Sequence, residues 1–116
     1  MWFNNNLPET KDGKFVAYRF EVKNPVISEK IIINKNFYKE LIGKHADDPR
    51  YVDKLEISQQ AHVLLQEAFF VRLEEPIHHT EIEAFWVFQK EYNGFEIEFK
   101  VKKDQRGYFL YYMRIL

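Results

Sequence analysis

The fold is decided by residues 81–116, EIEAFWVFQKEYNGFEIEFKVKKDQRGYFLYYMRIL. Asn93-Gly94 stands between two alternating apolar runs and is the strongest short-range signal for a β-hairpin, because a type I′ turn needs positive φ at both central positions. The strand after the turn alternates between two faces: Phe95, Ile97, Phe99 and Val101 are apolar, whereas Glu96, Glu98, Lys100 and Lys102 are charged. We therefore expect three antiparallel strands, over 81–92, 95–102 and 108–116.

The length of each turn predicts which residues share a face of this sheet. A two-residue Asn93-Gly94 loop pairs Tyr92 with Phe95, Phe88 with Phe99 and Trp86 with Val101. A second loop over Lys103–Gly107 pairs Lys100 with Leu110, Glu98 with Tyr112 and Glu96 with Arg114. The last strand then adds Phe109, Tyr111, Met113 and Ile115 to the apolar face. The opposite face gathers acidic, basic and phenolic side chains: Gln89, Glu91, Glu96, Glu98, Lys100, Lys102, Tyr112 and Arg114.

The rest of the chain predicts helices and further strands. Alternation predicts a strand over 14–22, and the β-branched run Ile31–Ile33 a short one. Asn34 is a suitable N-cap for a helix over 35–45, and a second helical pattern runs over 50–75, with a break near Ile57-Ser58. The wide apolar stripe of that second pattern must pack on a large partner, which we expect to be the sheet.

These elements predict one α+β domain over residues 14–116, preceded by a flexible polar tail over 1–13. Two or three helices pack on one face of a four- to five-stranded, mainly antiparallel sheet, which ends in a three-strand meander. The chain has 116 residues, a net charge of −1 and no cysteine, which excludes a disulfide framework and thiolate metal sites. No apolar run reaches the about 18 residues of a membrane span, and the first residues do not resemble a signal peptide. We expect a cytoplasmic protein without a membrane partner.

The charged face supports two interpretations. It can be a solvated surface with cross-strand pairs that contribute about 0.2–1 kcal/mol each. It can also be a site that binds and cleaves a phosphodiester, in which Lys100 and Arg114 supply positive charge and Glu98 or Tyr112 transfers a proton.

The histidines leave a similar choice. His45, at the end of the first helix, is either a packed C-terminal residue or a catalytic or phosphate-contacting one. The adjacent pair His78-His79 has a spacing that matches no standard zinc site, so we expect neither metal nor other cofactor.

The order of these elements resembles a family of small RNases, the barnase–EndoU–colicin–RelE superfamily. The resemblance lies in Ile42-Gly43-Lys44-His45, in Leu73-Glu74-Glu75-Pro76-Ile77, in a strand that ends near Lys90, and in Phe95–Val101. It is closest to the terminal domains of phage and polymorphic-toxin proteins. The resemblance implies a metal-independent endoribonuclease that cleaves RNA by attack of the 2′-hydroxyl, with His45, Lys100 and Tyr112 or Arg114 in its site. It also implies a cognate inhibitor protein as a partner.

Two further functions remain open. The near-zero net charge and the many aromatic residues also suit a non-enzymatic protein-binding module, such as a phage-encoded inhibitor or an immunity-type protein, because aromatic residues and arginine are frequent interface anchors. An exposed edge strand could instead support an oligomer.

Overall fold

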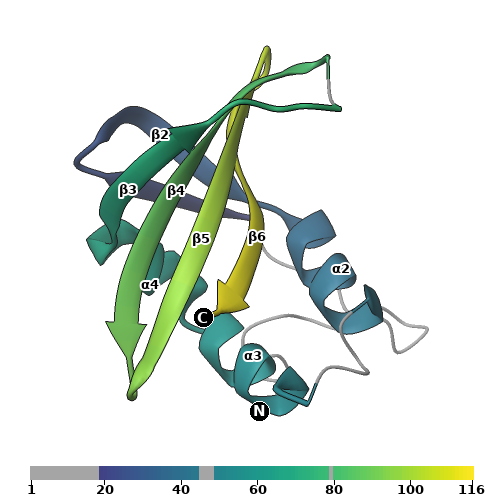
Figure 1. Cartoon of the computed structure of the whole chain (residues 1–116), viewed down its shortest axis with the longest axis vertical. Coiled ribbons are helices and arrows are strands. Elements are labelled where there is room, and N and C mark those ends of the chain that lie inside the picture. The colour runs from purple at the N-terminus through teal and green to yellow at the C-terminus, as the bar shows by residue number, and fades with distance from the viewer. Residues whose placement is uncertain (1–18, 45–48, 79) are drawn as a thin grey trace.

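The computed structural model describes residues 19–44, 49–78 and 80–116, which form an α+β fold with helices on one side of a curled sheet (Figure 1). The strands are β1 (Phe20–Asn24), β2 (Ile27–Ile33), β3 (Phe69–Glu74), β4 (Ile82–Tyr92), β5 (Phe95–Asp104) and β6 (Gly107–Ile115). The helices are α2 (Lys35–Lys44), α3 (Tyr51–Ser58) and α4 (Ala61–Glu67). The predicted tail over 1–13, the first residues of the predicted strand over 14–22, and His45 lie outside the described residues.

The sheet has more strands than the sequence predicts. Its order is β1-β2-β6-β5-β4-β3, with six strands in place of the expected four or five. β2 pairs with β6 in parallel, whereas the other neighbouring strands are antiparallel. The predicted three-strand meander is β4-β5-β6, and the short strand expected at Ile31–Ile33 is the buried end of the longer β2.

The Asn93-Gly94 hairpin is confirmed. Asn93 has φ 52° and Gly94 has φ 82°, so both central residues adopt the left-handed conformation that a type I′ turn requires. The predicted pairs of Tyr92 with Phe95, Phe88 with Phe99 and Trp86 with Val101 all occur.

The predicted helix over 50–75 is wrong in its last third. α3 ends at Ser58, α4 ends at Glu67, and residues 69–74 form the edge strand β3. Ala68 is already extended, with ψ 147°. The Phe69-Phe70-Val71 run that follows is aromatic and β-branched, which favours a strand paired with β4 over another helical turn.

One buried side chain fixes the end of α4 against the β1–β2 turn. Asn24, 3% exposed, donates hydrogen bonds of 2.9 Å from Nδ2 to the carbonyls of Leu65 and Ala68, while its Oδ1 accepts one from the backbone of Val26. The Leu65 carbonyl also accepts a 3.3 Å hydrogen bond from the backbone of Ala68, so Asn24 adds a second donor at the C-terminus of α4.

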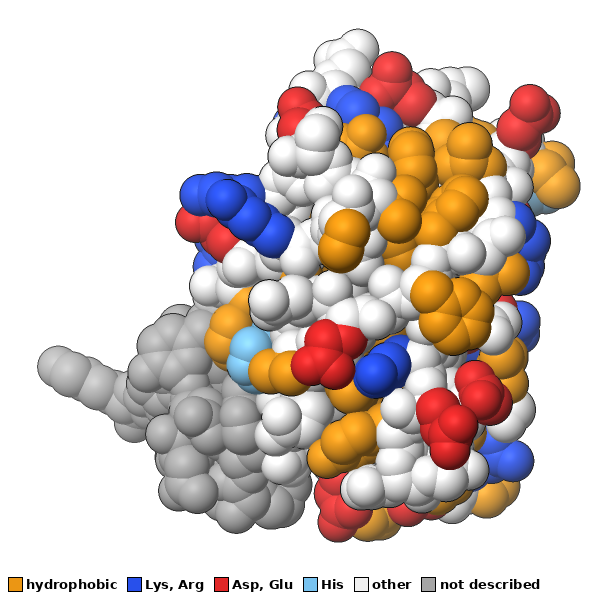
Figure 2. Space-filling view, turned by 90° about the vertical axis from the view of Figure 1, so that its left-hand side faces the viewer, with side chains coloured by type: hydrophobic (Ala, Val, Ile, Leu, Met, Phe, Trp, Pro, Cys, Tyr) orange, Lys and Arg blue, Asp and Glu red, His pale blue; other side chains and the backbone are white. Residues whose placement is uncertain are grey.

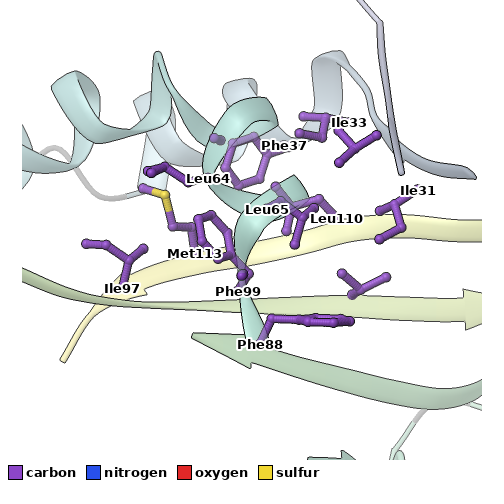
Figure 3. Packing of buried hydrophobic residues seen from close by; sticks show 14 of the residues in the cluster. Ile31, Ile33, Phe37, Leu64, Leu65, Phe88, Ile97, Phe99, Leu110 and Met113 are labelled. Atoms are coloured by element: carbon purple, nitrogen blue, oxygen red, sulfur yellow. The ribbon is translucent and has the colours of Figure 1, made fainter. Parts of the chain in front are cut away.

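The core lies between the helices and one face of the sheet (Figure 3). Phe37 of α2 and Leu64 and Leu65 of α4 point toward Phe99 of β5 and Met113 of β6. Burying a side chain of this size contributes about 1.5–3 kcal/mol. We call the sheet face away from these helices the outer face.

Candidate functional site

The β5–β6 register differs from the predicted one but keeps the same residues on the outer face. Glu98 pairs with Arg114 and Lys100 with Tyr112, so these two β5 residues each meet a β6 partner two positions beyond the expected one. Because side chains alternate with a period of two, a shift of two residues does not exchange the faces. Glu98, Lys100, Tyr112 and Arg114 therefore share the outer face, as predicted.

Two local features produce this register. The hairpin turn is shorter than expected, because Asp104 pairs with Gly107 and its Oδ1 accepts a 2.8 Å hydrogen bond from the backbone of Arg106. A bulge between Lys100 and Val101 then leaves an extra residue on β6.

The shorter turn and the bulge together change the placement of two aromatic residues, Phe109 and Tyr111, from the predicted one. Leu110, 4% exposed, belongs to the core, and Tyr111, 36% exposed, contacts Phe85 with ring centroids 5.1 Å apart. Phe109 pairs with Lys102, whose Nζ lies 5.7 Å from the centre of its ring. The expectation that Phe109 and Tyr111 join the core face is therefore wrong, whereas Met113 and Ile115 are in the core as predicted.

A buried carboxylate stands at the centre of the outer face. The Glu98 side chain is 2% exposed. Its Oε1 accepts a hydrogen bond of 2.8 Å from the hydroxyl of Tyr112 and one of 2.9 Å from Nε of Arg114. Its Oε2 lies 3.6 Å from Nη2 of Arg72. Three strands thus meet at one carboxyl group.

Strand β3 adds two residues that sequence analysis did not find. Nε of Arg72 donates a 2.8 Å hydrogen bond to Oε2 of Glu74, and Nζ of Lys100 lies 2.7 Å from Oε1 of the same carboxylate. Arg72 and Glu74 were not predicted to lie in the site, because this segment was predicted to be helical. The aromatic and β-branched run before them was the available signal for a strand. We call Arg72, Glu74, Glu98, Lys100, Tyr112 and Arg114 the charged cluster.

The cluster is electrostatically coupled. Burial raises the pKa of Glu98, but the hydrogen bonds from Tyr112 and Arg114 and the nearby guanidinium groups lower it by more, so the net pKa is below its usual value. The hydrogen bond from Lys100 is the main cause of the lowered pKa of Glu74. Burial, followed by the hydrogen bond to Glu98, raises the pKa of Tyr112 to about 12. Near neutral pH the cluster therefore holds three cations, two carboxylates and a neutral phenol.

The cations are closer to the surface than the central carboxylate. The side chains of Arg72 and Arg114 are 43% and 49% exposed, and that of Lys100 is 20% exposed. Val87 of β4, fully buried, lies in register between Arg72 and Lys100 and forms the apolar floor of the cluster. A ligand that approaches this face meets positive charge before it meets Glu98.

The structure thus brings together four of the five predicted site residues: Glu98, Lys100, Tyr112 and Arg114. The fifth, His45, lies outside the described residues, so its place in the site stays a prediction. Among the described residues, no group of three or more histidine, aspartate or glutamate side chains could hold a metal ion.

The chain matches no family model, no curated protein and no solved structure. The resemblance to the barnase–EndoU–colicin–RelE superfamily therefore stays a prediction. No helix in the described part of the chain is both long and apolar enough to cross a membrane.

Proposed function

We propose that the charged cluster binds the phosphodiester backbone of RNA and supports its cleavage by attack of the 2′-hydroxyl. The observation that carries this proposal is the convergence of three cations, from three different strands, on two neighbouring carboxylates. Arg72 and Arg114 lie against the buried Glu98, and Arg72 and Lys100 lie against Glu74. Guanidinium groups match the geometry of phosphate oxygens, and a cation near phosphorus stabilises the charge that develops there.

Glu74 occupies the position that a phosphate would take. Its carboxylate lies between Arg72 and Lys100, 2.7 Å from a nitrogen of each. It belongs to the edge strand β3 and its side chain is 30% exposed, so it can turn toward solvent. A phosphate that replaces it gains two ready cationic partners.

Glu98 is the proposed general base. The lowered pKa keeps it ionised near neutral pH. Its Oε1 already accepts two hydrogen bonds, which leaves Oε2, 3.6 Å from Arg72, to take the proton of the 2′-hydroxyl. Access to Oε2 requires the half-exposed Arg72 side chain to turn toward the phosphate.

Tyr112 is a positioning residue in this proposal. Its phenol donates to Glu98 and its pKa is raised to about 12, so it orients the base and is a poor proton donor to the leaving 5′-oxygen. That proton comes from water or from His45.

The test is an RNA-cleavage assay on a fluorescently labelled single-stranded RNA, in EDTA, with the wild-type chain and Lys100→Ala. We expect cleavage by the wild type and a loss of at least tenfold in the variant. Lys23→Ala is the matched control, because Lys23 is an exposed lysine of the other edge strand, β1, and we expect it to act like the wild type. Intact RNA at high concentrations of folded wild-type chain would contradict cleavage.

A second candidate function, binding of a protein partner, is favoured by the exposed apolar side chains of β3. Phe69, Val71 and Leu73 are 58%, 38% and 55% exposed, and Ile77 just beyond the strand is 85% exposed. The side of the molecule on which β3 lies in Figure 1 carries many hydrophobic side chains at its surface (Figure 2). An edge strand can accept a strand of another chain.

This second candidate is tested by affinity capture with the wild-type chain and Leu73→Lys side by side. A stoichiometric partner that binds the wild type and is lost with the variant would support it. Identical captured proteins with both baits would count against it.

A further inference from the structure

A cavity of about 290 Å³ lies between the start of α2 and the β5–β6 hairpin. Its charged and aromatic lining residues include Lys39 and Glu40 on the helix side and Lys102, Arg106, Phe109 and Tyr111 on the sheet side. Its volume is close to the lower end of the about 300–1,000 Å³ that small-molecule sites usually span.

The topology explains why a cavity forms here. β2 pairs with β6 only through Ile31 with Tyr108 and Ile32 with Phe109. Beyond that point the chain turns into α2, which lies beside β6 where a strand would otherwise continue (Figure 1). A helix cannot approach a strand edge to the about 4.8 Å of a paired strand, so a gap remains between the two elements.

Cations and aromatic rings meet in this gap. Nζ of Lys102 and Cζ of Arg106 lie 5.7 Å and 5.2 Å from the centre of the Phe109 ring. The Asp104 carboxylate lies 3.4 Å from Arg106 and 3.8 Å from Lys102, and it offsets part of their charge. Tyr111 is 36% exposed and Lys39 is exposed. A nucleotide site needs two groups: an aromatic ring on which the base stacks and a cation that contacts the phosphate.

The sheet-side residues of the cavity continue the charged cluster along β5 and β6. Lys100 of the cluster and Lys102 of the cavity are two residues apart on β5, which places them about 7 Å apart along the strand. The rings of Tyr111 and Tyr112 touch edge to face, with centroids 6.3 Å apart. An RNA strand whose phosphate lies on the cluster thus has a neighbouring nucleotide within reach of the cavity.

We propose that this cavity is a base-binding subsite, in which an unpaired nucleobase of the RNA stacks on Tyr111 while Lys102 and Arg106, which lie over the Phe109 ring, contact the adjacent phosphate. The proposal rests on the proposed function and deepens it by naming the substrate class. A base can enter such a cavity only when it is unpaired and unstacked, so the subsite selects single-stranded RNA over a duplex.

The test uses two fluorescein-labelled uridine octamers, one complete and one with its two central bases removed. Both carry 2′-O-methyl riboses, which prevent cleavage. The affinity of the chain for each octamer is measured by fluorescence anisotropy in EDTA. Stacking of a base on an aromatic side chain corresponds to about tenfold in affinity. We expect Tyr111→Ala and removal of the bases each to weaken binding by about this factor. For the octamer that lacks the two bases, we expect Tyr111→Ala and the wild type to have the same affinity. Tyr111→Phe keeps the stacking surface and should bind like the wild type.

Equal affinity of the wild type for the two octamers, or an equal loss by Tyr111→Ala on both, would overturn the subsite and leave the phosphate-binding cluster standing. Absence of binding to either octamer by the folded wild type would overturn both proposals. Tyr111→Leu retains an apolar side chain but removes the ring, and it replaces Tyr111→Ala if thermal unfolding shows that the alanine variant does not fold.

Discussion

Glu98→Gln removes the central charge of the cluster and leaves the shape of the side chain almost unchanged. The wild-type carboxylate is 2% exposed and accepts hydrogen bonds from Tyr112 and Arg114. A hydrogen bond that involves a charged group contributes about 1.5–3 kcal/mol, against about 0.5–1.5 kcal/mol for a neutral one. The amide of the variant can keep both bonds, but each bond becomes weaker.

Two effects reduce the resulting loss of stability. Burying an amide costs less than burying a carboxylate, and the guanidinium of Arg114 is half exposed, so water screens its attraction to Glu98. From a gross loss of about 1 kcal/mol for each of the two bonds, we expect Glu98→Gln to lower the free energy of unfolding by about 1–2 kcal/mol at pH 7. Urea denaturation measures this difference, with an unchanged m-value if only stability has changed.

The pH dependence of this difference has a definite sign. The folded pKa of Glu98 lies below its ordinary value, so its ionised form stabilises the fold above the unfolded pKa of about 4.3, and this stabilisation is lost as the pH falls through the folded pKa. The gap between wild type and Glu98→Gln should therefore shrink below about pH 4. Asp104 also has a lowered pKa but lies outside the charged cluster and titrates in both proteins, so its effect cancels in the difference. A gap that stays constant from pH 7 to pH 3, or a variant as stable as the wild type at pH 7, would refute this reasoning.

Three further changes test other parts of the structure. Glu74→Gln removes the carboxylate that lies between Arg72 and Lys100, so we expect a gain of a few-fold in affinity for single-stranded RNA in an anisotropy titration; weaker binding would show that Glu74 does not compete with phosphate. Asn24→Ala leaves the carbonyls of Leu65 and Ala68 without their side-chain donor, and urea denaturation should show a loss of about 1–3 kcal/mol; a loss below a few tenths would contradict the capping role. Gly94→Ala places a side chain at φ 82° and should cost about 1 kcal/mol by the same assay, whereas unchanged stability would mean that the turn rearranges.

The parts of the fold that were predicted depend on local chemistry. Asn93-Gly94 determines its own turn type, and the register of β4 with β5 follows from it without any distant contact. The shared face of Glu98 and Arg114 was predicted even though their pairing was not, because the turn and the bulge together shift the register by an even number of residues.

The parts that were missed depend on tertiary contacts. Phe70 and Leu73 satisfy a helical spacing in sequence, and their pairing with Phe88 and Trp86 of β4 selects the strand that the aromatic and β-branched run at the start of β3 also favours. Arg72 and Glu74 of the cluster were missed for the same reason. The bulge that exposes Tyr111 contains no glycine or proline, so the sequence carries no signal that predicts it.

The central claim is that the outer face binds RNA phosphates, and the salt dependence of RNA binding tests it most directly. The measurement is the affinity for the 2′-O-methyl uridine octamer at several salt concentrations, for the wild type, Arg114→Ala and the exposed-arginine control Arg19→Ala. We predict that Arg114→Ala weakens binding about tenfold and lowers the slope of log affinity against log salt by about 0.7, the value for one phosphate contact on a single strand, while Arg19→Ala matches the wild type. Absence of binding by the folded wild type, or identical curves for the wild type and Arg114→Ala, would contradict the claim.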